Sequence, residues 1–182
     1  MNPPLDRMTL LIDPRHLAHR VEELAEQISR DMTGRHPVLR HPVLAVVLKG
    51  GFLFGADLVK ALKEPAPVVF IHPGEENQSP FITPPDQRLL QGRDVVLVDI
   101  LLDSGEGLRR VIEAVEALHP ASLRLAVFLH RTVPEAEPLT VHYLGFEVPE
   151  MRLVGYGLAE EQRFRGLPAI YTWRPESLLP KA

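Results

Sequence analysis

Residues 95–108, with the sequence VVLVDILLDSGEGL, constrain the fold of this 182-residue chain more than any other segment. The first four residues are continuously apolar, which is typical of a parallel strand that is buried on both faces. Two acids, Asp99 and Asp103, follow, and a glycine-rich turn then leads into residues with helical periodicity. The segment therefore predicts a strand, a tight turn and a helix, with two carboxylates beside the turn.

The glycine-rich turn has the composition of an anion-binding site. It consists of Ser104, Gly105, Glu106 and Gly107. Backbone N–H groups at a helix start lack partners, and together with the helix dipole they favour a phosphate that glycines allow to approach closely. The dinucleotide fingerprint is excluded because position 110 is Arg, and the Gly-Lys-Ser/Thr of a Walker loop does not occur. We predict a phosphate cradle whose neighbouring acids face a sugar or a metal; an ordinary tight turn is the alternative.

Apolar runs alternate with amphipathic helical patterns along the rest of the chain. We expect helices at about 14–34, 52–62 and 106–118, and strands at 43–48, 67–71, 95–98, 123–129 and 141–146. This alternation predicts an α/β fold in which a parallel sheet is flanked by helices and binds its ligand at the carboxyl ends of the strands. Residues 72–91 are rich in Pro without periodicity, so we expect a long loop there.

Two features near the N-terminus have simple interpretations. His16 and His19 lie one turn apart on the first expected helix and could bind a metal, but without an evident third ligand we favour solvent-exposed histidines. The sequence RHPVL occurs at 35–39 and again at 40–44. Five residues are too few for a structural repeat, so we interpret it as a local duplication without a function of its own.

The composition indicates one globular domain over residues 1–182. A net charge of −4 offers no general attraction to nucleic acid or to an anionic membrane. No apolar run approaches the roughly 20 residues that span a bilayer, and the first residues lack the basic and apolar regions of a signal peptide. The chain has no cysteine, which suits a cytoplasmic enzyme.

Three stretches in the chain carry a resemblance to a known family. The segment 95–108 resembles the ribose-phosphate motif of type I phosphoribosyltransferases. VLKGGFLFGADL at 47–58 resembles the pyrophosphate loop of their hypoxanthine-guanine branch, and YLGFEVPEMRLVGYGL at 143–158 resembles its purine-side segment. The resemblance implies the type I fold: a twisted, mostly parallel sheet flanked by helices, with a core at about 35–146 and a small hood built from the chain ends.

The resemblance also implies a reaction: displacement of pyrophosphate from phosphoribosyl pyrophosphate by hypoxanthine or guanine, which gives IMP or GMP. Asp103 matches the catalytic acid near the purine N7, and Asp99 matches an acid that holds the ribose hydroxyls directly or through Mg²⁺. The pyrophosphate side is matched by Lys49, Gly50, Gly51 and Arg165. The base side is matched by His130, Arg152 and Leu153. In this family the Leu-Lys peptide of the pyrophosphate loop is often cis.

Several residues depart from the family pattern. Ile100 stands in place of the second acid of the pair, and Ala159 in place of an acid that would bind a second metal. His130 replaces a lysine that reads the purine 6-oxo group, although a neutral imidazole still donates one hydrogen bond. Arg152 replaces a stacking aromatic residue and adds a positive charge. The segment 72–91 is shorter than the mobile catalytic loop of the family and lacks its Ser-Tyr pair.

Two functions remain open at this point. The first is a purine phosphoribosyltransferase, with Mg²⁺ bound mainly through phosphoribosyl pyrophosphate and with activity weakened or base preference altered by the departures. The alternative is a catalytically poor relative that binds nucleotide or phosphoribosyl pyrophosphate as a sensor or accessory protein. An RNA-binding regulator has little support, because no basic stripe with aromatic residues occurs. The resemblance further implies a homo-dimer or tetramer.

Overall fold

The central feature of the fold is a sheet of five parallel strands. The computed structural model describes residues 7–32, 41–74, 78–131, 133 and 138–175. The strands of this sheet are ordered β3-β2-β4-β5-β6. They are β2 (Val43–Val47), β3 (Val68–Ile71), β4 (Asp94–Leu102), β5 (Ser122–Arg131) and β6 (Tyr143–Val148). The predicted mostly parallel sheet is therefore confirmed.

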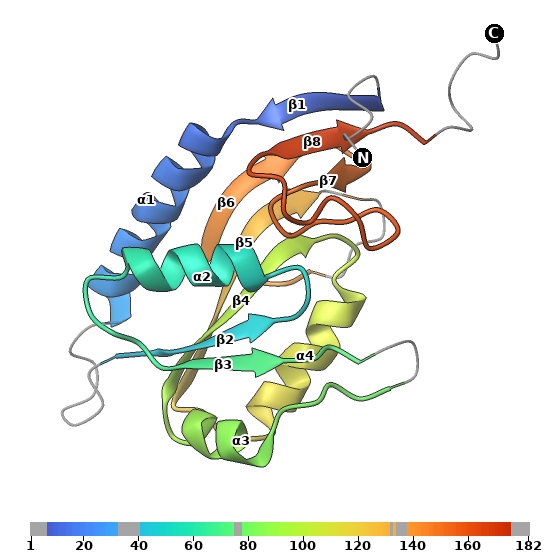
Figure 1. Ribbon diagram of the computed structural model, residues 1–182. Helices are drawn as coiled ribbons and strands as arrows, with labels where there is room; N and C mark the ends of the chain where they lie inside the picture. Colours follow the sequence, from blue (N-terminus) through green and yellow to red (C-terminus); the bar gives the residue numbers. More distant parts are fainter. Residues whose placement is uncertain (1–6, 33–40, 75–77, 132, 134–137, 176–182) are drawn as a thin grey trace, which may run out of the picture.

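Helices cover both faces of this sheet (Figure 1). They are α1 (Pro14–Met32), α2 (Phe52–Ala61), α3 (Pro84–Leu90) and α4 (Glu106–Glu116). Apolar residues of α1 and α2 pack with Val96 and Val98 of β4 on one face, whereas residues of α3 and α4 pack with Val95 and Leu97 on the other. The continuous apolar run of β4 is thus explained, because successive side chains enter two different cores.

A second, smaller sheet forms the expected hood from the two ends of the chain. It is antiparallel, with the order β1-β8-β7, and consists of β1 (Met8–Ile12), β7 (Leu153–Val154) and β8 (Ile170–Trp173). The Arg7 guanidinium lies 4.4 Å from the centre of the Trp173 ring and donates a hydrogen bond to the Arg174 carbonyl. These contacts tie the N-terminal strand to the last strand and hold the hood together.

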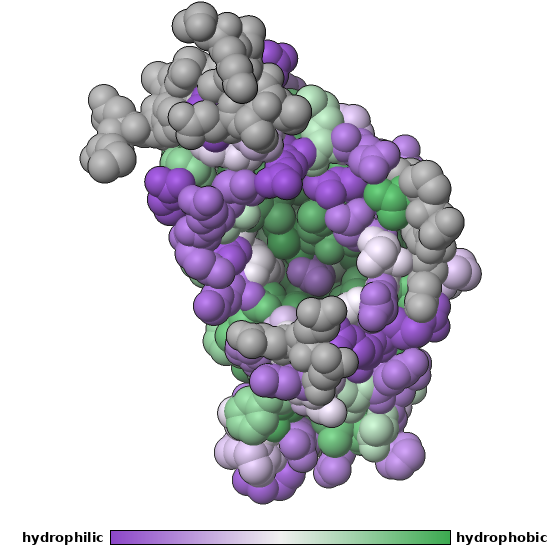
Figure 2. Space-filling model, turned by 90° about the vertical axis from the view of Figure 1, so that its right-hand side faces the viewer, coloured by the Kyte–Doolittle hydropathy of each residue, from purple (hydrophilic) through white to green (hydrophobic). Residues whose placement is uncertain are grey.

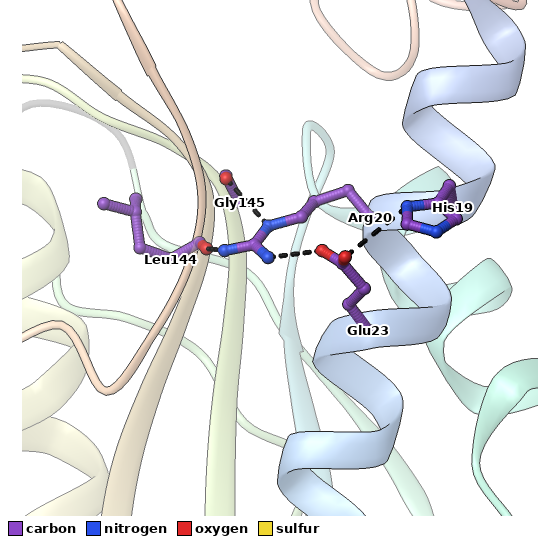
Figure 3. Close-up of polar contacts among 5 residues, drawn as sticks. All are labelled: His19, Arg20, Glu23, Leu144 and Gly145. Carbon is purple, nitrogen blue, oxygen red and sulfur yellow. Dashed lines mark hydrogen bonds and ion pairs between the residues drawn. The ribbon is translucent and has the colours of Figure 1, made fainter.

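Helix α1 is fastened to the edge of the central sheet by one arginine (Figure 3). Arg20 donates to the carbonyl oxygens of Leu144 and Gly145 on the edge strand β6, at 2.7 and 3.0 Å, and pairs with Glu23 on its own helix. These bonds tie α1 to the edge of the sheet, and a charged side chain that covers an edge strand also opposes its pairing with other chains.

The two histidines of α1 are solvent-exposed, as the sequence predicts. His16 lies 2.6 Å from Asp13, and His19 lies 3.5 Å from Glu23; the histidine side chains are 77% and 73% exposed. Within the described parts of the chain, no group of three or more His, Cys, Asp or Glu side chains is arranged to hold a metal ion.

The prediction of a structureless loop at 72–91 is wrong, because this segment contains α3. Thr83 caps the helix by accepting a hydrogen bond from the Asp86 N–H at 3.3 Å, and two prolines occupy the first helical positions. Proline is tolerated there because these N–H groups have no intrahelical partner. Pro84 and Pro85 therefore mark a helix start, whereas Pro73 and Pro80 lie outside this helix. The boundaries of the other predicted strands and helices agree with the structure or differ by at most four residues.

The first RHPVL copy, at 35–39, lies outside the described residues, and the second copy runs into the start of β2. In the described ranges, no helix combines the length and the apolar character needed to cross a membrane.

Candidate functional site

A cleft of about 270 Å³ lies at the carboxyl ends of β2 and β4. Its lining includes both acids of the 95–108 segment, Asp99 and Asp103, and three residues of the glycine-rich turn, Ser104, Gly105 and Gly107. Apolar side chains such as Leu48 complete the lining. Figure 2 looks onto this side of the molecule and shows a hollow with a largely hydrophobic floor and a hydrophilic rim. The position is the one at which open parallel sheets bind ligands.

A larger depression of about 630 Å³ lies between α1 and α2, but it contains none of the predicted site residues. Its charged groups are already paired in part, since Lys60 lies 2.6 Å from Asp57 on α2. It lies against helix surfaces and has neither a strand end nor a glycine turn. We therefore assign the functional site to the smaller cleft.

The glycine-rich turn has the geometry of a phosphate cradle. Gly105 has φ 86° and ψ −17°, a left-handed conformation that strongly favours glycine, and α4 begins at the next residue. No side chain of the described residues caps this helix start, which leaves its first N–H groups available to a ligand. A Cβ atom at Gly107 would have no atom within 4 Å. The turn is therefore open on the side from which a phosphate would approach.

Asp99 lies on β4 rather than after it, because this strand runs on to Leu102. Burial raises the pKa of the Asp99 carboxyl to about 7, although the N–H groups of Ile100 and Leu101 favour the ionised form. The Ile100 N–H donates to Asp99 Oδ1 at 2.7 Å. Near neutral pH this carboxyl is therefore divided between its two protonation states, and a cation beside it would shift it to the ionised form.

Asp103 makes an ion pair that the sequence did not reveal. Its Oδ2 accepts a hydrogen bond from Nη1 of Arg131 at 2.8 Å, and the Arg131 side chain is only 15% exposed. Arg131 is the last residue of β5. An arginine at the carboxyl end of a predicted core strand is a signal by which the sequence could have indicated Arg131 as a site residue. Its pairing with Asp103 could not be deduced from the sequence.

The predicted pyrophosphate loop is held tightly between β4 and the hood. The Leu48–Lys49 peptide is cis, as the family resemblance implied. A Cβ atom at Gly50 would lie 2.7 Å from Cγ2 of Ile100, and one at Gly157 would lie 2.1 Å from the Gly50 carbonyl oxygen. Only glycine therefore fits at positions 50 and 157. Ile100, which stands in place of the second acid of the family, packs against this loop.

Arg165 reaches the same region through the hood. Its Nη1 donates to the Gly157 carbonyl at 2.7 Å, and the Gly157 N–H donates to the Arg165 carbonyl at 2.9 Å. The neighbouring Tyr156 hydroxyl donates to Asp57 on α2 at 2.8 Å. These bonds bring Arg165 close to the loop of Lys49, Gly50 and Gly51 by way of Gly157.

The predicted base-side residues lie around the ends of β5 and β7. His130 is half-buried near the end of β5, and Leu153 is buried in the core at the start of β7. Arg152 donates from Nη1 to Glu160 at 2.9 Å, with its side chain 63% exposed. Because Glu160 balances its charge, Arg152 does not add an unpaired positive charge to the base side. Arg131 connects this region to Asp103, since its Nη2 donates to the Met151 carbonyl at 2.7 Å.

Comparison with known proteins agrees with this architecture. The phosphoribosyl transferase domain matches residues 11–161. Hypoxanthine-guanine phosphoribosyltransferase of Aquifex aeolicus is 30% identical over 171 residues, which cover 91% of this chain and 94% of that protein. The Mycobacterium avium enzyme of the same name is 29% identical over 94% of this chain and 88% of its own length.

Solved structures give the same result. The crystal structure of a hypoxanthine-guanine phosphoribosyltransferase from Bacillus anthracis superposes with a TM-score of 0.79, at 30% identity over 91% of this chain and 97% of that one. A variant of hypoxanthine phosphoribosyltransferase from Trypanosoma cruzi, complexed with the product IMP, superposes with a TM-score of 0.85. It is 26% identical over 97% of this chain and 96% of that one.

The parallel sheet, the hood and the cleft at the strand ends are those of a phosphoribosyltransferase, and the chain belongs to that family. Within the family it belongs to the hypoxanthine-guanine branch of the type I enzymes.

Proposed function

We propose that the protein transfers the phosphoribosyl group of phosphoribosyl pyrophosphate to hypoxanthine or guanine and releases pyrophosphate. The observation that carries this proposal is the cleft at the carboxyl ends of β2 and β4, where the glycine-rich turn and two carboxylates meet. The pyrophosphate loop packs against the same stretch of β4 through Gly50 and Ile100. A substrate with a 5′-phosphate, a ribose and a pyrophosphate could contact all three groups at once.

Each part of the substrate has a proposed partner. The 5′-phosphate would accept hydrogen bonds from the backbone of 104–107, which has an open approach at Gly107. The ribose hydroxyls would face Asp99. Pyrophosphate would lie against Lys49, Gly50, Gly51 and Arg165, whose donors would stabilise the charge that develops on the leaving group. Asp103 would accept a hydrogen bond from the purine N7 side.

The base would lie between His130 and the segment that contains Arg152 and Leu153. The ion pair with Glu160 constrains the Arg152 guanidinium, whose plane can stack on a purine much as an aromatic ring does. Most of this side chain is exposed, so we expect weaker stacking than a buried aromatic residue would give. We therefore expect the protein to bind nucleotides measurably but to bind the free base with only modest affinity.

Mg²⁺ would need oxygen ligands from the substrate in addition to those of the protein. Asp99 offers one carboxylate, whereas Ile100 is buried against Gly50 and Ala159 has no oxygen in its side chain. Mg²⁺ commonly binds through one or two carboxylates together with substrate phosphates. We therefore propose that Asp99 and the oxygens of phosphoribosyl pyrophosphate hold the ion, which when bound would neutralise charge on the leaving pyrophosphate.

A homo-oligomer is supported by aromatic residues on the surface. Phe70 on the edge strand β3 is 50% exposed, and Phe81, which bridges to the residue after that strand, is 62% exposed. Large apolar side chains at a sheet edge are commonly covered by another subunit. Light scattering at several protein concentrations would measure the state; the cytoplasmic location stays a prediction.

The proposed reaction is tested by incubating the protein with phosphoribosyl pyrophosphate, Mg²⁺ and either hypoxanthine or guanine, and by quantifying IMP, GMP and pyrophosphate. We expect both nucleotides, with pyrophosphate in equal amount, and loss of product in Asp103→Asn. A protein that binds IMP but forms no nucleotide from either base would instead be the sensor or accessory relative that the departures at Ile100 and Ala159 allow.

A further inference from the structure

One guanidinium joins two parts of the proposed site that are distant in sequence. Arg131 Nη1 donates to Oδ2 of Asp103 after β4, at 2.8 Å, and Nη2 donates to the carbonyl of Met151 before β7, at 2.7 Å. We propose that Arg131 is a positioning residue for phosphoribosyl transfer to the base, which fixes the Asp103 carboxylate relative to the segment that holds the base. This inference rests on the proposed function.

The geometry explains how Arg131 would act. A guanidinium is planar and offers donors in two fixed directions, so it can hold a carboxylate and a carbonyl at a constant separation. Its bond to Oδ2 leaves Oδ1 of Asp103 as the remaining acceptor for a ligand. Met151 directly precedes Arg152 and Leu153, the residues proposed to contact the base. Both sides of the purine contact therefore depend on one side chain.

The burial of Arg131 supports a fixed rather than a fluctuating contact. Its side chain is 15% exposed, whereas that of Asp103 is 45% exposed and lines the cleft. The arginine thus approaches the carboxylate from the protein side and leaves its other side open to substrate. A purine held by Arg152 and Leu153 would meet an acceptor that is already oriented, and pre-orientation of this kind lowers the barrier to reaction.

The same strand supplies a matched control. Arg124, also on β5, has a side chain 19% exposed and pairs at 3.0 Å with Asp31, which is 44% exposed. It also donates to the Tyr143 hydroxyl at 2.9 Å. The two arginines therefore have nearly equal burial and bonding. Arg124 lies near the start of the strand, away from the cleft, so its loss affects stability without touching the proposed site.

The test compares Arg131→Gln, Arg131→Lys and Arg124→Gln by steady-state kinetics with each substrate varied. We expect Arg131→Gln to lower kcat/KM for hypoxanthine by about 10²-fold, the usual scale for an ångström of misplacement, with KM for phosphoribosyl pyrophosphate changed less than about twofold. Arg131→Lys should be intermediate, since one ammonium cannot hold both partners. Arg124→Gln should keep both parameters near wild type despite a lower melting temperature.

A double-mutant cycle shows whether Arg131 acts through Asp103. If it does, Arg131→Gln should slow the Asp103→Asn enzyme far less than it slows the wild type, because the two changes disturb one shared interaction and only the contact with the Met151 carbonyl remains to be lost. Additive losses would overturn the proposal, as would an Arg131→Gln enzyme that keeps its base kinetics or loses both substrates equally. If that variant does not fold, Arg131→Lys carries the same test. A wild type that forms no IMP or GMP would refute the proposed function instead.

Discussion

Replacing Asp99 by Asn should stabilise the folded protein, and increasingly so as the pH rises. Burial raises the pKa of this carboxyl from its ordinary value of 3.8 to about 7. Between these values the folded state binds a proton that the unfolded state has released. The free energy of unfolding of the wild type therefore falls as the pH rises through this window and levels off above pH 7. An amide mimics the protonated acid and avoids this loss.

The size of the effect follows from the pKa shift. The full pKa shift corresponds to about 4 kcal/mol of unfolding free energy. Two factors reduce the difference that can be measured: Asp99 is partly open to the cleft, and the wild type has already lost part of this stability at pH 5. We therefore expect the advantage of Asp99→Asn over the wild type to grow by about 2 kcal/mol between pH 5 and pH 8. Nucleotide synthesis should fall at the same time, since stability gained at a functional site commonly costs activity.

Urea unfolding at pH 5 and pH 8 measures this difference. Asp94→Asn on the same strand is the control: the Asn Oδ1 can still accept the Ser122 hydroxyl hydrogen bond but without the carboxylate charge, so this replacement should not stabilise the protein and should lower stability slightly. An Asp99→Asn protein that gains no stability at pH 8, or gains more at pH 5 than at pH 8, would refute the argument that burial makes the ionised Asp99 costly.

Three further predictions concern the loop, the cradle and the metal. Gly50→Ala should raise KM for phosphoribosyl pyrophosphate at least tenfold, because its Cβ would lie 2.7 Å from Ile100, whereas Gly166→Ala, with nothing within 4 Å, should leave KM unchanged. Gly107→Thr, whose Cβ would enter open space, should tighten IMP binding about fivefold in calorimetry through one added hydroxyl donor. Calorimetry with Mg²⁺ alone should detect weak binding at most, because Asp99 is the only acid of the family's pair that the chain retains.

Each of these has a contrary outcome. Equal KM changes in the two alanine variants would show that the close approach at Gly50 does not shape the pyrophosphate loop. Unchanged or weaker IMP binding by Gly107→Thr would place the phosphate away from that position. Tight Mg²⁺ binding to the protein without substrate would require oxygen ligands beyond Asp99.

The sequence predicted the features that depend on local pattern. The apolar run before Asp99 and the glycine turn that follows are continuous in the chain, so the strand, turn and helix could be predicted together. Helix α3 was missed because residues 72–91 are rich in Pro and lack helical periodicity, although Thr83 and the prolines that follow it form a regular helix start. Strand β7 has only two residues, too few for any periodicity to identify it.

Contacts between distant segments could not be predicted in this way. Arg131 and Asp103 are 28 residues apart and meet only because β4 and β5 are neighbours in the sheet. The pairing of Arg152 with Glu160 likewise depends on how the hood segment folds back, and it changes the interpretation of the arginine from a free cation to a neutralised one. The high pKa of Asp99 arises from burial, which the sequence does not reveal for a single acid.

A crystal structure of the protein with bound IMP tests the central claim most directly, because it locates phosphate, ribose and base in one experiment. We expect the phosphate on the backbone amides of 104–107, the ribose beside Asp99, and the purine between Asp103 and the Arg152 segment. A nucleotide bound in the depression between α1 and α2, or in the cleft with its phosphate away from the glycine turn, would contradict the assignment of the site.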